Sequence, residues 1–280
     1  MPNQAPLRSV TIGDKTVTFL PDGGGTLAPT ALFPVSSAEG WQSYPSLLDD
    51  DGNFVTSVGG FLIKTGDKLI AVDTGFGALR VDFPGFGPLI GGDYHKSFSA
   101  TGHQREDVTD VIFTHLHLDH VGWTTLEVDG QRELMYPNAR YWCAQAEWEF
   151  WHGGNSPIGP HPEFVQKPLE NLIQFVQDGD EIAPGIKVVS TPGHLSLVVD
   201  GGEAGRIFLT ADVFHGVAQL TESDWAVAFD NDPTLARTTR EALYTQLTQP
   251  NTLCAINHFS NEVFGHITPA GERYAWQLLS

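Results

Sequence analysis

The chain has 280 residues, of which 41% are hydrophobic, enough for one large α/β domain or two small ones. Its 34 acidic and 15 basic residues give a formal net charge of −19, which opposes binding to nucleic acid and to anionic membranes. Two cysteines, Cys143 and Cys254, exclude a disulfide framework and a cysteine-rich zinc site, and their apolar surroundings predict that both are buried.

The first residues, 1–7, contain no apolar run that could serve as a signal peptide. No window approaches the roughly 18 apolar residues of a membrane span. The chain also shows no internal repeat and no linker that would divide it. We therefore expect a single domain over residues 1–280, in a soluble cytoplasmic protein.

The first part of the chain is rich in predicted strands. Val10–Ile12 and Val17–Leu20 flank a short turn that contains glycine, and Phe61–Lys64 and Leu69–Asp73 flank another. Each pair predicts a β-hairpin.

Two Gly- and Pro-rich stretches, Pro21–Pro34 and Phe76–Asp93, interrupt this pattern. The second one contains Phe76, Phe83 and Phe86. Long loops of this kind are often functional, so this stretch predicts a mobile aromatic loop that could cover a site.

Strands and helices follow one another in the rest of the chain. The predicted strands are Ala139–Cys143, Ile186–Ser190, Leu195–Val199, Arg206–Thr210 and Thr252–Ile256. The predicted helices are Ala144–Trp151, Glu163–Phe175, Thr234–Leu247 (with Asp232 or Thr234 as N-cap) and Gly271–Leu279. Strands grouped in each half, with helices after them, favour an α/β fold of two β-sheets packed face to face with helices outside.

A dense group of metal-ligand residues follows the apolar run 111–113. Within six residues the chain places four ligand-type side chains: His115, His117, Asp119 and His120. This spacing suits an irregular turn at the end of a buried strand, since an uninterrupted helix would point i and i+2 to different sides. Imidazole and carboxylate at this density suit zinc or a similar divalent ion.

Three further ligand-type residues follow later strands. His194 follows the strand Ile186–Ser190, Asp212 follows Arg206–Thr210, and His258 follows Thr252–Ile256. Each is the first strong ligand after an apolar strand. We therefore expect all three on one rim, together with the cassette of residues 115–120.

These motifs, with Val72-Asp73-Thr74-Gly75 before them, resemble the metallo-β-lactamase fold superfamily over roughly residues 54–266. The resemblance implies an αββα sandwich of two mixed β-sheets with a binuclear site at one edge. It implies that His115, His117 and His194 hold the first metal and that Asp119, His120 and His258 hold the second. Asp212 would bridge the two ions, and Asp73 would orient ligands by a hydrogen bond. The expected cofactors are two divalent ions, zinc first, with Mn, Fe or Co as alternatives.

The chain departs from the family pattern at one point. Many members continue Thr-Pro-Gly-His with a second Gly-His, whereas here Leu195 and Ser196 follow His194 directly. The ligand is retained, but the turn that carries it should be tighter.

A two-metal site of this kind supports hydrolysis by a hydroxide that bridges the metals, and the chain has no Gly-x-Ser-x-Gly nucleophile motif. The catalytic candidates are Asp119 and Asp212, which are also candidate ligands, and His215. His215 could act as an acid/base, orient the substrate or only form part of the pocket wall. The acyl-homoserine lactonases of the superfamily tend to have tyrosine at this offset. Histidine here, with His120–Trp123 and Phe229–Asp232, looks more like the methyl parathion hydrolase branch.

The implied substrate is a neutral, partly apolar ester, lactone or organophosphate triester. Five aromatic side chains are candidates for the pocket wall: Phe76, Phe83, Phe86, Trp123 and Trp151. A thioester hydrolase, an iron persulfide dioxygenase and a non-catalytic metal-binding module of the same fold remain alternatives. No nucleic-acid or membrane partner is expected, and a homodimer is possible.

Overall fold

The computed structural model describes residues 1–279. The first sheet contains β1 (Arg8–Ile12), β2 (Lys15–Leu27), β3 (Phe54–Thr65), β4 (Lys68–Val72), β5 (Arg80–Phe83), β6 (Gly87–Ile90), β7 (Asp110–Ile112), β10 (Arg140–Ala144) and β11 (Ile173–Val176). The second sheet contains β12 (Glu181–Ala183), β13 (Ile186–Thr191), β14 (His194–Asp200), β15 (Arg206–Leu209), β16 (Thr252–Ala255), β17 (Phe264–Ala270) and β18 (Arg273–Leu278).

The helices are short, except for the last. They are α1 (Pro29–Leu32), α2 (Ala38–Trp41), α3 (Tyr94–Ser99), α4 (Leu118–Val121), α5 (Gln145–Trp151), α6 (Lys167–Leu169) and α7 (Pro233–Leu247). A small separate hairpin is formed by β8 (Thr125–Val128) and β9 (Gln131–Leu134). No helix among residues 1–279 is long and apolar enough to cross a membrane.

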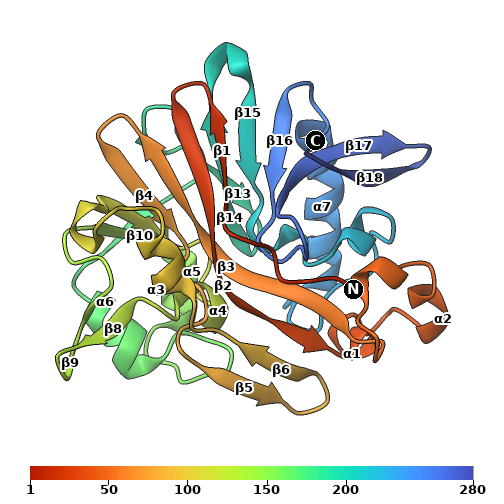
Figure 1. The fold of residues 1–280 in the computed structure, drawn as a ribbon, viewed down its shortest axis with the longest axis horizontal. Coiled ribbons are helices and arrows are strands. Elements are labelled where there is room, and N and C mark those ends of the chain that lie inside the picture. Colours follow the sequence, from red (N-terminus) through yellow and green to blue (C-terminus); the bar gives the residue numbers. More distant parts are fainter. Residues whose placement is uncertain (280) are drawn as a thin grey trace.

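The two sheets face one another across a continuous apolar core, as expected (Figure 1). Because side chains alternate between the two faces of a strand, each sheet also has an outer apolar face. Phe98 of α3 and Trp148 of α5 pack on the outer face of the first sheet. Leu243 and Leu247 of α7 pack on the outer face of the second sheet. The result is the predicted αββα sandwich of two mixed sheets.

The ends of four strands meet at one edge of this sandwich. β4 and β7 run parallel in the first sheet, and β15 and β16 run parallel in the second. The carboxyl ends of parallel neighbours lie at the same edge, so the residues that follow them converge. The two sheets are joined there by the hydrogen bond that Leu195 N donates to Thr114 O at 2.8 Å.

Most predicted elements are present with small shifts of their ends. The two predicted hairpins, β1–β2 and β3–β4, are present, with Ile12 paired to Lys15 and Thr65 paired to Lys68 next to their turns. Helix α7 begins after Asp232, whose carboxylate accepts from the amides of Thr234 and Leu235. The expected capping residue is therefore confirmed.

The helix predicted over Glu163–Phe175 is wrong. A π-helical turn at Pro162–Gln166 leads into α6, which is only three residues long, and Ile173–Val176 forms the edge strand β11. Pro168, the second residue of α6, has no amide hydrogen for a continuing helix. The segment that follows instead pairs in parallel with β10.

The closing helix predicted over Gly271–Leu279 is also wrong. The chain forms the hairpin β17–β18, in which Ala270 pairs with Arg273 across a tight turn. Gly271 occupies that turn with a φ of +66°, a conformation that glycine adopts without strain. Sheet pairing therefore overrides the helical spacing of the apolar residues.

The two glycine-rich stretches contain more strand than expected. β2 continues to Leu27 through three consecutive glycines. A Cβ on Gly24 would lie 2.1 Å from the carbonyl oxygen of Thr56, so the close approach of β3 requires glycine there. The stretch Phe76–Asp93 contains the hairpin β5–β6, which joins the first sheet through the pairing of β6 with β2. It is an ordered extension of the sheet rather than the predicted aromatic loop.

Candidate metal centre

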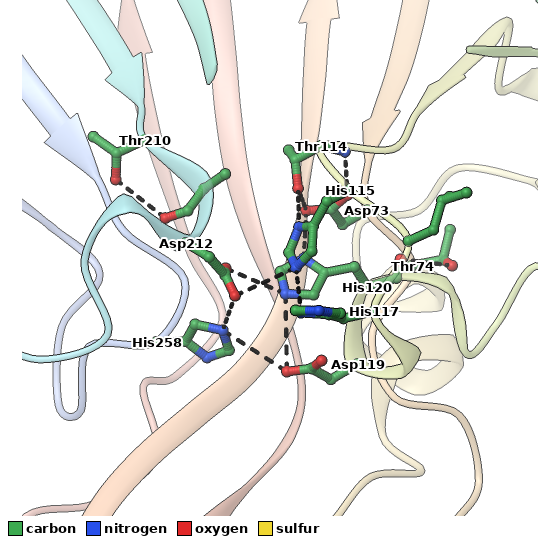
Figure 2. Close-up of polar contacts among 12 residues, drawn as sticks. Asp73, Thr74, Thr114, His115, His117, Asp119, His120, Thr210, Asp212 and His258 are labelled. Carbon is green, nitrogen blue, oxygen red and sulfur yellow. Dashed lines mark hydrogen bonds and ion pairs between the residues drawn. The ribbon is translucent and has the colours of Figure 1, made fainter. Parts of the chain in front are cut away.

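The cassette begins where β7 ends. His115 is 2% exposed, and its Nε2 lies 3.0 Å from Nδ1 of His117, the residue that precedes α4. The single turn of α4 then carries Asp119 and His120. Figure 2 shows these side chains facing Asp212 from the second sheet. The predicted irregular turn therefore brings the ligand-type side chains together.

Asp212 lies at the centre of the cluster. Its Oδ2 is 3.1 Å from Nε2 of His258 and 3.5 Å from Nε2 of His115. The same oxygen is 3.2 Å from Nε2 of His215, and Oδ1 is 3.2 Å from Nε2 of His120. One carboxylate thus contacts imidazoles from both halves of the molecule, as a bridging ligand would.

Three groups of side chains bring their ligand atoms within 4.8 Å of one another. They are His115 with His194 and Asp212, Asp119 with His120 and His258, and Asp212 with His215 and His258. The first two groups match the two expected sets, except that His117 joins the first only through its contact with His115. The tight β13–β14 turn still presents His194 to the cluster, as predicted.

Hydrogen bonds outside the cluster orient two of the imidazoles. Nδ1 of His258 lies 2.9 Å from the carbonyl oxygen of Ser57, and a carbonyl can only accept. Nδ1 of His120 lies 2.8 Å from Oδ2 of Asp73. Both contacts leave Nε2 directed at Asp212, which is how protein metal sites fix the ligating nitrogen.

Asp73 also fixes the start of the cassette. Its two carboxylate oxygens accept the backbone amide and the hydroxyl of Thr114, both at 2.8 Å. The backbone of Asp73 has a φ of +61°, a strained conformation for a residue with a side chain. The orienting contact that the resemblance predicts is therefore present.

Burial and charge act differently on the imidazoles. Burial lowers the pKa of His115 well below its ordinary value and that of His194 to about 3. Burial also opposes the charged form of His120 and His258, but the nearby carboxylates, Asp212 first, outweigh it and raise both pKa values. Burial alone would raise the pKa of Asp212, yet the imidazoles around it, His120 first, hold it well below its usual range.

The residues present fit a pair of divalent ions. Nε2 of His120 and Oδ1 of Asp212 are buried, and although they lie 3.2 Å apart, neither atom makes a hydrogen bond to any described residue. Such atoms cost free energy when they are left unsatisfied. Nitrogen and oxygen donors held this close would be satisfied by a cation of the zinc type.

An apolar cavity opens onto the cluster. His117, Asp119, Asp212, His215 and His258 line it where it meets the cluster. Its other walls are largely apolar and come from distant segments: Leu27, Leu32, Phe83, Phe86, Leu89 and Phe229. An uncharged, partly apolar molecule could therefore reach the ligand atoms.

A second cavity adjoins the same cluster. It shares His117, Asp212, His215 and Phe229 with the first, and Glu147 and Asp230 also line it. These acidic groups would repel an anionic ligand.

The predicted pocket aromatics divide into two sets. Phe83 and Phe86 line the apolar cavity, and Trp151 lines the second one. Phe76 is fully buried in the core, and Trp123 lines neither cavity, because its indole donates to Asp22. The expectation was wrong for these two residues.

Two acidic residues near the centre were not identified as site residues from the sequence. Glu147 accepts the amide of Leu116 at 2.8 Å and the indole N–H of Trp151 at 2.7 Å, and burial raises its pKa. Asp22 accepts hydrogen bonds from the backbone amides of Phe76 and Gly77 in the loop before β5. Neither lies in a motif, and only the folded structure brings their partners to them.

Proteins of similar sequence agree with this architecture. Residues 60–258 match the Metallo-beta-lactamase superfamily. An N-acyl homoserine lactonase of Bacillus sp is 24% identical over 193 residues, which cover 63% of this chain and 71% of that protein. Metallo-beta-lactamase domain-containing protein 1 of Xenopus laevis is 28% identical over 162 residues, 56% of this chain and 58% of that protein.

Solved structures of similar fold cover nearly the whole chain. AidC, a dizinc quorum-quenching lactonase in complex with a product, has a TM-score of 0.83 at 20% identity and 99% coverage of both chains. The hydrolase AbOPH has a TM-score of 0.80 at 24% identity, with 99% of this chain and 98% of that chain covered. With the family match over more than half of its length, the chain belongs to the metallo-β-lactamase superfamily.

Proposed function

We propose that this protein is a binuclear metal-dependent hydrolase of neutral lactones and related esters that carry an apolar group. Residues 1–280 would form its single domain. The observation that carries the proposal is the position of Asp212, which joins the two ligand groups at the inner end of the apolar cavity. The similarity to lactonases, in sequence and in fold, supports the choice of a lactone.

The proposed ligand sets are those that the family resemblance implies, and the close approach of these side chains supports them. His115, His117 and His194 would hold one ion, and Asp119, His120 and His258 the other, with Asp212 between them. Two divalent ions bound here, zinc by preference, would lower the pKa of water enough for it to attack at neutral pH and would polarise the substrate carbonyl. Asp73 and the carbonyl of Ser57 would keep the imidazoles oriented for this task.

His215 would serve the leaving group. It lines both cavities, and its Nε2 contacts Asp212 while its buried Nδ1 has no partner among the described residues. Its ring stacks on His258 with the centroids 5.0 Å apart, which limits its rotation. An imidazole held in this way can donate a proton to the alkoxide that leaves or bind a polar atom of the substrate.

The apolar cavity would receive the acyl part of the substrate. Leu89, Phe86 and Phe229 lie along it, and burial of each methylene there contributes about 0.8 kcal/mol. The scissile carbonyl would then lie at the cluster. Anionic substrates are disfavoured, because Glu147 and Asp230 line the adjoining cavity.

The experiment is a substrate panel on metal-loaded protein. It contains N-acyl homoserine lactones of short and long acyl chain, an aryl ester, a thioester and a phosphotriester. We expect turnover of the lactones, higher kcat/KM for the longer chain, and close to two equivalents of metal per chain. No turnover of any substrate would refute the hydrolase. One equivalent of iron would point to the dioxygenase chemistry of the same fold. A preference for the thioester or the phosphotriester would mean that this compound class, rather than the lactone, is the substrate.

A further inference from the structure

Asp22 occupies an irregular position in β2. The pairing of β2 with β3 shifts its register between Pro21 and Gly23, which makes Asp22 the extra residue of a β-bulge. Bulges redirect a side chain that would otherwise follow the regular alternation. Here the redirected side chain is a carboxylate in a residue that is only 1% exposed. A buried carboxylate without a cationic partner must be stabilised by hydrogen bonds.

Five N–H groups supply these hydrogen bonds. Oδ2 accepts from the amides of Phe76 at 2.6 Å and Gly77 at 3.0 Å. Oδ1 accepts from the amides of Gly92 and Tyr94, both at 2.8 Å, and from the indole of Trp123 at 3.0 Å. The first two amides precede the β5–β6 hairpin and the next two follow it. One carboxylate therefore holds both ends of the hairpin.

The backbone closes tightly around this carboxylate. A Cβ on Gly91 would lie 2.5 Å from the carbonyl oxygen of Gly77 and 2.8 Å from Oδ2 of Asp22. A Cβ on Gly75, whose φ is +63°, would lie 2.6 Å from the same Oδ2. These glycines let two loop segments approach one buried side chain, and hydrogen bonds to an ionised acceptor are the strong ones.

The hairpin held in this way forms one wall of the apolar cavity. Phe83, Phe86 and Leu89 all lie on it and line the cavity. Phe86 stacks on Phe229 with the ring centroids 5.3 Å apart, and its carbonyl accepts the amide of Ala28. The base of the hairpin at Asp22 thus determines where its aromatic side chains stand relative to the metal centre.

We propose that Asp22 is a positioning residue that holds the β5–β6 hairpin over the centre and thereby sets the affinity for the apolar part of the substrate. This inference rests on the proposed function. The hydrogen bonds of Asp22 go to the two ends of the hairpin and to Trp123 and to none of the seven proposed ligands, so a change at this position should act on the cavity wall rather than on the metals.

The test is Asp22→Asn, which preserves the shape of the side chain. One carboxylate oxygen becomes an amide nitrogen, which cannot accept, so at least two of the N–H groups lose their acceptor. Loss of a hydrogen bond to a charged group changes the equilibrium constant for local opening by a factor of about ten or more. We expect faster hydrogen exchange by that factor at the amides of residues 76, 77, 92 and 94. We also expect a similar rise of KM for a long-chain lactone, with kcat and metal content retained.

Asp110→Asn is the control for the loss of a buried carboxylate, although Asp110, unlike Asp22, also pairs with Arg140 at 2.7 Å. Asp110 is a fully buried carboxylate that also accepts an indole N–H, from Trp142 at 3.0 Å, but it lies at the end of β7 away from the cassette. It should lower stability without raising KM. Equal KM changes in both variants, or unchanged exchange at the four amides in Asp22→Asn, would overturn the inference.

The two proposals fail in different ways. A wild-type protein that hydrolyses nothing refutes the hydrolase, whereas the exchange comparison still decides whether Asp22 holds the hairpin. Should Asp22→Asn not fold, the wild-type protein provides the measurement. Gly92 is exposed to solvent, so slow exchange of its amide supports the hydrogen bond to Asp22, and exchange as fast as that of the exposed turn residue Gly85 overturns it.

Discussion

The carboxylate of Asp73 lies 2.8 Å from Nδ1 of His120 and joins the end of β4 to the last residue of the ligand cassette. The same carboxylate accepts two hydrogen bonds from Thr114, so it fixes both the backbone that enters the cassette and the ring of one ligand. Asp73 is 4% exposed, and water cannot easily replace these contacts.

Asp73→Asn should weaken the binding of the second metal. An asparagine can keep one contact to Thr114, but it cannot accept the full set of hydrogen bonds that holds His120. Loss of such an orienting partner typically costs about 10–100-fold in metal affinity. Competition with a chelator of known affinity measures the change. Asp110→Asn is a suitable control, and equal metal affinity of Asp73→Asn and wild type would contradict the orienting role.

Asp212→Ala should have a larger effect, because Asp212 contacts imidazoles of both ligand groups. We expect loss of hydrolysis and less than two equivalents of metal per chain by elemental analysis. Asp212→Asn retains one oxygen of the carboxylate and should lie between the alanine variant and the wild type in metal content. An alanine variant with full metal and full activity would refute the bridging role.

His215→Phe separates proton transfer from metal binding. Phenylalanine can preserve the stacking on His258, and loss of a general acid lowers kcat by about 10²–10⁴-fold. The metal content should stay at two equivalents. His266→Phe on β17 is a control outside the cluster, since His266 bonds to the carbonyl of Thr252. If His215→Phe binds one equivalent of metal less than the wild type, His215 is a ligand. If its kcat and KM are unchanged, His215 only lines the cavity.

The candidate ligand residues could be located from the sequence because each group of them follows an apolar strand. His194, Asp212 and His258 are far apart in sequence, but the parallel pair β15–β16 and the turn of the antiparallel hairpin β13–β14 place them at one edge. The sequence pattern therefore contained both the chemistry and the approximate location.

Other parts of the site depend on tertiary contacts that no local pattern reveals. Asp22 and the indole of Trp123 are separated by 101 positions, and Glu147 reaches the backbone of Leu116 across 31 positions. The failed helix over Gly271–Leu279 has a related cause, because its apolar spacing fits a strand equally well. Pairing with β17, which only the fold supplies, decided between the two.

The two cysteines should be unreactive in the folded protein. Both are fully buried, as expected from the sequence, and burial raises the pKa of each thiol to about 12. At pH 8 both thiols are therefore protonated, and the thiolate is the reactive form. Mass spectrometry after treatment with iodoacetamide should show no adduct under native conditions and two adducts in denaturant. A native adduct on Cys143 or Cys254 would show that its surroundings open to solvent.

Removal of the metals should lower thermal stability. Nε2 of His120 and Oδ1 of Asp212 are buried without hydrogen-bond partners among residues 1–279, so the apoprotein retains unsatisfied polar groups. A ligand that binds only the folded state at a thousandfold its Kd adds about 4 kcal/mol. We therefore expect Tm to fall after dialysis against a chelator and to recover with zinc. Asp212→Ala should show a much smaller zinc-dependent shift; an equal shift in both proteins would place the stabilising ion elsewhere.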